Sequence, residues 1–470
     1  MPPSIRVDDL LAATGGRLLG PTTVTTFSTA AVDSRHVIPG SCFVALRGER
    51  VDGHRFVAEA LRNGAVATIV QRAVELPAGL DAAVVQVADP LMALQDLAAW
   101  WRSRLAVRVV GITGSTGKTI AKEIVADVLS RTLDVLRNEG NLNSETGLPM
   151  TLLQLEPSHE VAVLEMSMYT EGEIARLAEI ARPEIGVVLA VHPTHLERAG
   201  SIDAIARAKA ELPAALPDHG LAVLNADDPR VAAMRAITSA EVRTFGLSDT
   251  ADVRATGLAS LGLAGTAFTL RTPWGTRLVR SATPGRHLVP HALAAVAVAE
   301  RLGVPLDEVE AALAAGSHAP HRMAVLEAAS GATVVDDTYN ASPVSVGAAL
   351  DFLAETKVAS GRRRLAVLGD MLELGPEEER LHREIGAKAA AILDGLVAVG
   401  ERGRWIADAA RAAGLAAVAT ARDADEASAV VERALGPRVG DLLLVKGSRG
   451  VELDRLVVAL GVDPLGAAAR

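Results

Sequence analysis

Residues 107–119 read VRVVGITGSTGKT, an apolar run followed by a glycine-rich loop that ends in Lys-Thr. The apolar run predicts a strand over Val107–Ile112, and the helical period of Ile120–Ser130 predicts that the loop opens a helix. Glycines let backbone N–H groups turn toward phosphate oxygens, a lysine can bridge the β- and γ-phosphates, and a threonine hydroxyl can ligate Mg²⁺. The stretch therefore predicts use of ATP or GTP, although Ile112 stands where the strict pattern has glycine. The residues expected to hold the nucleotide are Gly114, Ser115, Thr116, Gly117, Lys118 and Thr119.

Strand-like and helix-like segments alternate after this loop. Val161–Leu164 and Ile185–Val191 are apolar strand candidates with helical segments between them. This alternation indicates a parallel sheet with helices on both faces. Alternating β-like sequence follows at about 250–282. A second strand–helix alternation runs from near Pro320 to Val445 and indicates a second doubly wound unit.

The part before the loop has a different pattern. Short β-like runs lie between glycine and proline turns up to about residue 85, and Leu91–Leu105 reads as a linking helix. The whole chain therefore predicts an α/β protein of three domains. These are a small N-terminal α/β domain, a central parallel-sheet domain with a phosphate loop, and a C-terminal Rossmann-like domain. The expected bounds are 1–85, 86–318 (with 86–105 as the linker helix) and 319–470.

Composition excludes several classes of protein. The chain has 470 residues, 49% hydrophobic and 22% charged, which is typical of a globular protein and not of a disordered one. Its net charge of −10 argues against a general binder of nucleic acid or of a membrane surface. The single cysteine, Cys42, excludes an intrachain disulfide and is expected to be small and buried. No signal-peptide pattern and no membrane-spanning run is present, so we expect a cytoplasmic protein.

Further motifs are spread in order over nearly the whole chain, and together with the loop they resemble the Mur ligases and folylpolyglutamate synthetases. These enzymes are three-domain, ATP-dependent and amide-forming. The motifs are Asp33-Ser34-Arg35, Phe43–Gly48, Gly140-Asn141-Leu142-Asn143, His195-Leu196-Glu197 with Lys209, Arg322-Met323, Asp336–Asn340, Leu368–Gly375 and Lys446-Gly447-Ser448-Arg449. Asp336–Asn340 and Leu368–Gly375 are most similar to the branch of the Mur ligases that adds D-alanyl-D-alanine.

The resemblance implies the substrates. An enzyme of this branch would join D-alanyl-D-alanine to UDP-N-acetylmuramoyl-tripeptide through an acyl phosphate, with release of ADP and phosphate, in peptidoglycan precursor synthesis. By resemblance, the first domain would bind the UDP end of the substrate. The implied substrate-binding residues are Ser34, Arg35, Leu46, Arg47, Gly48, Asn141, Asn143 and Asn340. The partners would be these small molecules, with no nucleic acid and no membrane span, and the protein would be a monomer.

The chemistry needs cations because the γ-phosphate and the substrate carboxylate are both anionic. By resemblance, Glu165 would hold one Mg²⁺ together with Thr119, and His195 would hold a second Mg²⁺. An ammonium cannot ligate a metal ion. In the resembled family the lysine that matches Lys209 is carbamylated and becomes an anionic ligand. The implied catalytic residues are thus Lys118, His195 and Lys209, and Arg322 and Asp337 would reach ATP from the third domain when the domains close.

Some positions depart from the family pattern. Tyr169 and Ala190 stand where asparagine or histidine residues are usual, and His291 replaces an asparagine. The segment Asp227-Asp228-Pro229-Arg230 resembles a recognition motif of a sister ligase, but it lies in the middle block and is interpreted as a turn. Two alternatives therefore remain. One is a ligase that adds another amino acid, and the other is an ATP-binding homologue without catalysis.

Overall fold

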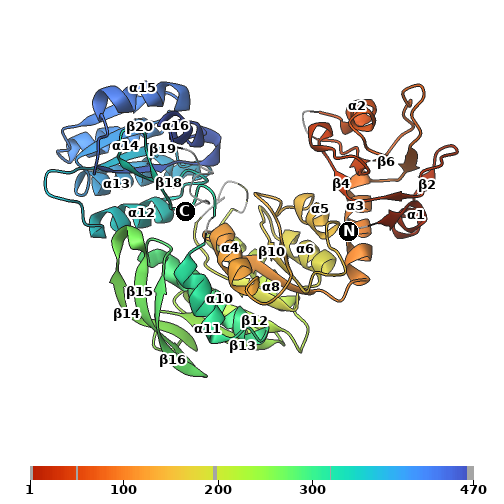
Figure 1. Ribbon diagram of the computed structural model, residues 1–470, viewed down its shortest axis with the longest axis horizontal. Coiled ribbons are helices and arrows are strands. Elements are labelled where there is room, and N and C mark those ends of the chain that lie inside the picture. The colour runs from red at the N-terminus through yellow and green to blue at the C-terminus, as the bar shows by residue number, and fades with distance from the viewer. Residues whose placement is uncertain (1–3, 49–50, 194–197, 199, 318, 463–470) are drawn as a thin grey trace.

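The computed structural model describes residues 4–48, 51–193, 198, 200–317 and 319–462. Strands and helices fall into three groups along the chain, and the N-terminal and C-terminal groups lie on opposite sides of the middle one (Figure 1). The expected α/β architecture is therefore confirmed. Within the described residues, no helix is long and apolar enough to cross a membrane.

The N-terminal group is built on a five-stranded sheet with the order β2-β7-β6-β5-β4. All neighbouring strands are parallel except β2, which runs antiparallel to β7. Cys42 begins β5 and is fully buried, as its sequence context predicts. The elements are β1 (Ile5–Arg6), α1 (Val7–Thr14), β2 (Arg17–Leu18), β3 (Thr26–Phe27), β4 (Ala30–Ala31), β5 (Cys42–Val44), α2 (Val57–Arg62), β6 (Ala67–Val70) and β7 (Ala83–Gln86).

Helix α3 (Pro90–Ser103) connects this group to the middle one. The Asp89 carboxylate caps its N-terminus by accepting from the backbone N–H groups of Leu91 and Met92. Its buried face packs against α1 on one side and against helices of the middle group on the other. The predicted boundary at residue 85 falls inside β7, one residue before that strand ends. We keep the division at about 85 and 318 as a proposal.

The middle group holds a nine-stranded sheet with the order β16-β15-β14-β13-β12-β11-β8-β10-β9. In this order, each pair of neighbours from β14 to β9 is parallel. Strand β15 runs antiparallel to both of its neighbours, β14 and β16. Strand β8 lies between β10 and β11, which both follow it in sequence, so the chain leaves β8 at a switch point of the sheet, where such folds bind ligands. The elements are β8 (Arg108–Thr113), α4 (Lys118–Leu129), β9 (Val135–Arg137), α5 (Gly147–Leu152), β10 (Val161–Glu165), α6 (Glu173–Ala181), β11 (Ile185–Val188), α8 (Ile202–Ala214), β12 (Leu221–Asn225), α9 (Pro229–Ala233), β13 (Glu241–Gly246), β14 (Val253–Ser260), β15 (Thr266–Thr272), β16 (Gly275–Ser281), α10 (Val289–Arg301) and α11 (Leu306–Ala315).

The C-terminal group is a six-stranded sheet with the order β17-β18-β22-β19-β20-β21, in which only β17 is antiparallel. Its strands are nearly all buried, as expected for a parallel sheet with helices on both faces. The elements are β17 (Ala324–Glu327), β18 (Thr333–Asp337), α12 (Pro343–Glu355), β19 (Arg364–Gly369), α13 (Glu378–Ala390), β20 (Gly395–Val399), α14 (Gly403–Ala412), β21 (Val418–Ala421), α15 (Ala424–Ala434), β22 (Leu442–Lys446) and α16 (Asp454–Ala459).

The predicted elements are present with shifted ends. Strand β11 ends three residues before the predicted Val191, because the chain leaves the sheet at Leu189 to contact the phosphate loop. Strand β10 extends one residue past its predicted end and includes Glu165. Helix α8 starts at Ile202, with Ser201 as its N-cap, and continues through Pro213 to Ala214.

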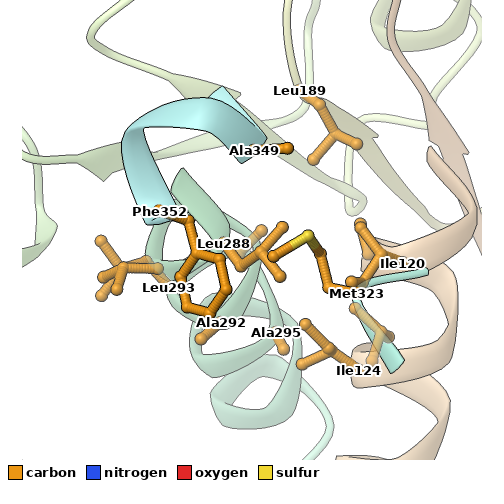
Figure 2. Close-up of a cluster of buried hydrophobic side chains, with 14 of the residues drawn as sticks. Ile120, Ile124, Leu189, Leu288, Ala292, Leu293, Ala295, Met323, Ala349 and Phe352 are labelled. Carbon is orange, nitrogen blue, oxygen red and sulfur yellow. The ribbon is translucent and has the colours of Figure 1, made fainter. Parts of the chain in front are cut away.

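An apolar cluster joins the middle and C-terminal groups (Figure 2). Phe352 of α12 lies beside Leu288 and Leu293, and Met323 lies between Leu288 and the side chains of α4. These side chains are almost completely buried. The cluster therefore fixes how the segment before β17 meets the helix that follows the phosphate loop.

Candidate active site

The phosphate loop lies between β8 and α4, as the sequence predicts. Gly117 has φ of 79°, and a Cβ on it would lie 2.0 Å from Nε2 of His291, so only glycine fits there. The Lys118 ammonium donates to the carbonyl of Gly114 at 2.8 Å. Burial lowers the pKa of Lys118, and the nearby Glu165 carboxylate opposes this effect.

Glu165 lies at the C-terminal end of β10, directly beside the start of α4. Its Oε2 accepts from the Thr119 hydroxyl at 2.8 Å, and its Oε1 accepts from Nδ2 of Asn143 at 2.7 Å. Ser167 holds Asn143 in turn by donating to its Oδ1 at 2.9 Å. The structure thus brings together two predicted metal residues, Thr119 and Glu165, with the predicted substrate residue Asn143.

The segment after β11 is tied to the loop from two sides. The Ser115 N–H donates to the Ala190 carbonyl, and the Ser115 hydroxyl contacts both the N–H and the carbonyl of His192. From the other side, Asp228 accepts from the N–H of Val191 at 2.7 Å. Asp228 also accepts from the N–H groups that open α9, so the segment predicted as a turn is a turn only up to Asp228 and begins a helix at Pro229. His195, the predicted ligand of a second metal ion, lies outside the described residues.

Lys209 is buried in α8 with only 3% of its surface exposed. Burial and the positive charge of Lys118 lower the pKa of Lys209 well below its usual value. A buried lysine with this pKa carries a neutral amine over much more of the pH range than an exposed one does.

A cavity of about 830 Å³ lies between the middle and C-terminal groups. Most of the predicted nucleotide, metal and substrate residues of these two groups line it, whereas Gly114 and Lys209 do not. The predicted residues that line it are Ser115, Thr116, Gly117, Lys118, Thr119, Asn141, Asn143, Glu165, Arg322, Asp337 and Asn340. This volume is in the range of pockets that bind small ligands.

Arg322 crosses from the C-terminal group to the phosphate loop. Its Nη2 donates to the Thr119 hydroxyl at 2.7 Å, and its guanidinium lies 4.1 Å from the ring centroid of Tyr339. The neighbours His321 and Met323 both have positive φ, 61° and 53°, which L side chains rarely adopt. The backbone is strained on both sides of the arginine, and such strain persists only where surrounding contacts hold it.

Asp337 and Asn340 both contact Lys446, a residue to which the sequence assigned no role. The Lys446 ammonium lies 2.5 Å from Oδ2 of Asp337 and donates to the Asn340 carbonyl at 2.9 Å. Two partly buried histidines, His287 and His291, also line the cavity, and desolvation lowers the pKa of each to about 4. The motif around Lys446 marked its segment, but the pairing with Asp337 depends on the alignment of β18 with β22.

The predicted substrate residues of the N-terminal group lie apart from this cavity. Ser34 is buried, and Arg35 is held by Asp33, whose pKa falls to about 2 mainly through their hydrogen bond. The turn at 46–48 is fixed by Gly53, whose N–H donates to the Leu46 carbonyl at 2.8 Å. None of the predicted residues Ser34, Arg35, Leu46, Arg47 and Gly48 lines the cavity.

His54 and Asp52, which no sequence motif had singled out, stabilise this turn. His54 lies 2.7 Å from Asp52 through Nδ1 and accepts from the Gln71 N–H through Nε2. Its ring therefore connects the turn to the strand β6 that precedes Gln71.

The donor set beside Lys118 fits Mg²⁺. A hydroxyl and a carboxylate are hard oxygen donors, and Mg²⁺ is typically held by one or two carboxylates together with phosphates and water. Within the part of the chain that is described, no three His, Cys, Asp or Glu side chains gather into a complete metal site. Protein oxygens from Thr119 and Glu165 would thus supply part of a coordination shell that nucleotide oxygens complete.

Three family models match consecutive parts of the chain. The model of the Mur ligase family catalytic domain matches residues 27–102, that of the Mur ligase middle domain matches 112–299, and that of the Mur ligase glutamate ligase domain matches 321–449.

Individual proteins match over almost the full length. The UDP-N-acetylmuramoyl-tripeptide–D-alanyl-D-alanine ligase of Escherichia coli K12 is 37% identical over 440 residues, covering 93% of this chain and 94% of its own. A crystal structure of MurF from Acinetobacter baumannii superposes with a TM-score of 0.86 at 32% identity, covering 97% of this chain and 99% of its own. The crystal structure of MurF from Thermotoga maritima in complex with ADP superposes with a TM-score of 0.79 at 29% identity, covering 92% of this chain and 96% of its own. The chain therefore belongs to the Mur ligase family.

Proposed function

We propose that this chain is an ATP-dependent ligase that adds D-alanyl-D-alanine to UDP-N-acetylmuramoyl-tripeptide in peptidoglycan precursor synthesis. The relatives that carry this activity in their names match more than nine-tenths of the chain. The observation in the structure that carries the proposal is the arrangement of Lys118, Thr119, Glu165 and Arg322 around one cavity between two domains. A site assembled from two domains suits a reaction that must exclude water from an activated intermediate.

The reaction has two steps. A carboxylate oxygen of the tripeptide first attacks the γ-phosphorus of ATP, so an acyl phosphate forms and ADP leaves. The amine of D-alanyl-D-alanine then attacks the acyl carbon, so the amide bond forms, phosphate leaves and a proton is lost from nitrogen. In the first step the phosphoryl oxygens carry negative charge, and in the second step negative charge builds on the acyl oxygen and then leaves with phosphate; preorganised cationic groups would stabilise these charges.

We assign the nucleotide roles by geometry. Phosphates bind loops of this kind at backbone N–H groups and at the N-terminus of the following helix, which here is α4. Lys118 contacts the loop at Gly114 and Arg322 contacts it at Thr119, so two cationic side chains from different groups would surround the transferred phosphoryl group. Asp337 and Asn340, held by Lys446, form the C-terminal wall of the same cavity.

Thr119 and Glu165 would hold Mg²⁺, which would neutralise phosphate charge and orient the γ-phosphate. We further propose that Lys209 acts as a carbamate and that His195 contributes to a second metal site. The buried position of Lys209 and its lowered pKa support this role, because CO₂ reacts with a neutral amine. The N-terminal group, through Ser34, Arg35 and the turn at 46–48, would bind the UDP end of the substrate.

The direct test is a phosphate-release assay with UDP-N-acetylmuramoyl-tripeptide, with and without D-alanyl-D-alanine. We expect phosphate release and a pentapeptide product only when ATP and both substrates are present. Release that depends instead on another amino acid would indicate a sister ligase, and nucleotide binding without turnover would indicate a non-catalytic homologue. Lys118→Ala should abolish product formation while the melting temperature changes little, since the substitution removes a partly buried ammonium whose hydrogen bond is to the neutral carbonyl of Gly114.

A further inference from the structure

Lys122 is a lysine with no exposed surface, one helical turn after Lys118 on α4. Its ammonium donates to the backbone carbonyl of Asn138 and lies 2.8 Å from the carboxylate of Glu123. Lys122 does not line the cavity, so it is placed to act on the site through other residues. Nothing in the reaction described above requires it.

Asn138 connects this lysine to Glu165. The Asn138 side chain is fully buried, and its Oδ1 accepts from the Glu165 N–H at 2.9 Å while its Nδ2 donates to the Glu165 carbonyl at 3.2 Å. The same Nδ2 donates to the carbonyl of Leu142 at 2.8 Å. One amide group thus holds the end of β10 and the loop that carries Asn141 and Asn143.

A buried ammonium is costly in this place. Removing a charge from water requires compensation by hydrogen bonds and an opposite charge, and an apolar side chain of similar volume often stabilises such a position equally well. A methionine at 122 would fill the same space between α4 and the loop. The ammonium of Lys122 therefore has a geometric role, because its hydrogen bond holds the backbone of Asn138 at a fixed distance from α4.

We propose that Lys122 and Asn138 are positioning residues that hold the Glu165 carboxylate and Asn143 in register with Thr119. The chain of contacts runs from α4 through the Asn138 backbone and amide to the backbone of Glu165. From there it returns to α4 through the bond between Glu165 and the Thr119 hydroxyl. This closed circuit sets the separation of the two oxygen donors proposed to hold Mg²⁺. Misplacing such a donor by a fraction of an ångström lowers both metal affinity and rate.

The test compares Lys122→Met and Asn138→Asp with wild type. Aspartate keeps the acceptor for the Glu165 N–H but loses both donated hydrogen bonds. We expect kcat to fall about 10- to 100-fold in both variants and the Mg²⁺ concentration for half-maximal rate to rise about tenfold. KM for D-alanyl-D-alanine should change little. Lys388→Met, which removes a partly exposed lysine paired with Asp351 on the C-terminal group, is the control and should behave as wild type.

The proposal for Lys122 and Asn138 rests on the proposed function, and a binding measurement tests the two separately. Binding of a fluorescent ADP analogue is measured with and without Mg²⁺, and it needs no turnover. We expect the two variants to bind the analogue as wild type does without Mg²⁺ and to lose most of the strengthening that Mg²⁺ gives. If wild type makes no product, the proposed function fails, while this measurement still tests the network. Unchanged Mg²⁺ dependence in soluble Lys122→Met, or in Asn138→Asp if the first variant does not fold, would overturn the proposal.

Discussion

The guanidinium of Arg322 donates a 2.7 Å hydrogen bond to the hydroxyl of Thr119, a residue 203 positions earlier in the chain. The same hydroxyl donates to Glu165, so one oxygen connects the C-terminal group, the phosphate loop and the end of β10. An arginine and a proposed metal ligand therefore share the position where the phosphates are proposed to bind. Entry of ATP with its metal ion would have to separate them and place phosphate oxygens between them.

Replacing Arg322 should impair the transfer step more than substrate binding. We expect Arg322→Ala to lower kcat about 100-fold, because one cationic group aimed at developing phosphoryl charge is lost. Arg322→Lys should recover only part of this loss, since an ammonium lacks the planar fork that contacts both Thr119 and the Tyr339 ring. Arg380→Lys, at an exposed arginine of α13, serves as the control. Steady-state kinetics in which Arg322→Ala matches wild type would exclude the proposed role.

Phe352 should contribute to the stability of the contact between the middle and C-terminal groups (Figure 2). Its ring is buried beside Leu288 and Leu293, so Phe352→Ala would leave a cavity in the shared cluster. We expect a loss of about 3–5 kcal/mol in the free energy of unfolding, measured by denaturant titration. Val458→Ala removes an exposed side chain of α16 and should change the same quantity by less than about 0.5 kcal/mol. Equal effects of the two substitutions would contradict the packing described here.

The ion pair of His321 and Asp336 should make stability depend on pH. Its 2.8 Å hydrogen bond raises the pKa of His321 above the usual value, so the folded chain binds a proton more tightly than the unfolded chain does. The stabilisation is fully present below the unfolded pKa of about 6.5 and is lost as the pH rises through the raised folded pKa. The melting temperature of His321→Gln should therefore lie further below wild type at about pH 5.5 than at about pH 9. A gap between His321→Gln and wild type that stays constant over this pH range would refute the linkage.

Local features explain what the sequence predicted well. The phosphate loop was recognisable because strand, glycine turn and helix follow one another within a few residues, and Gly117 needs its positive φ whatever surrounds it. Glu165 ends strand β10 beside β8, the strand that leads into the phosphate loop, and this position could be predicted for the same local reason. The three-domain α/β fold followed from the change of hydrophobic period along the chain.

Long-range contacts explain what the sequence did not predict. The pairing of Lys446 with Asp337 spans 109 positions and depends on which strands of the C-terminal sheet become neighbours. From the sequence, Lys122 would be an ordinary lysine on the exposed face of an amphipathic helix. It is buried because the loop at Asn138 folds over it. No short-range pattern distinguishes a lysine in either role from a lysine on the surface.

Lys209 should work only after it reacts with CO₂. Burial and the charge of Lys118 lower its pKa, so the neutral amine that forms a carbamate persists to lower pH than in an exposed lysine and is lost as the amine protonates. We expect ligation to fall in CO₂-depleted buffer, to recover with bicarbonate and to decline at mildly acid pH. Lys209→Ala should lose at least about 100-fold in rate, and acetate should restore part of it by supplying a carboxylate. ¹³C-bicarbonate should give a carbamate NMR signal in wild type and in the control Lys388→Ala but not in Lys209→Ala. Normal ligation by Lys209→Ala without CO₂ would show that the lysine is structural and that any second metal ion is held by other groups.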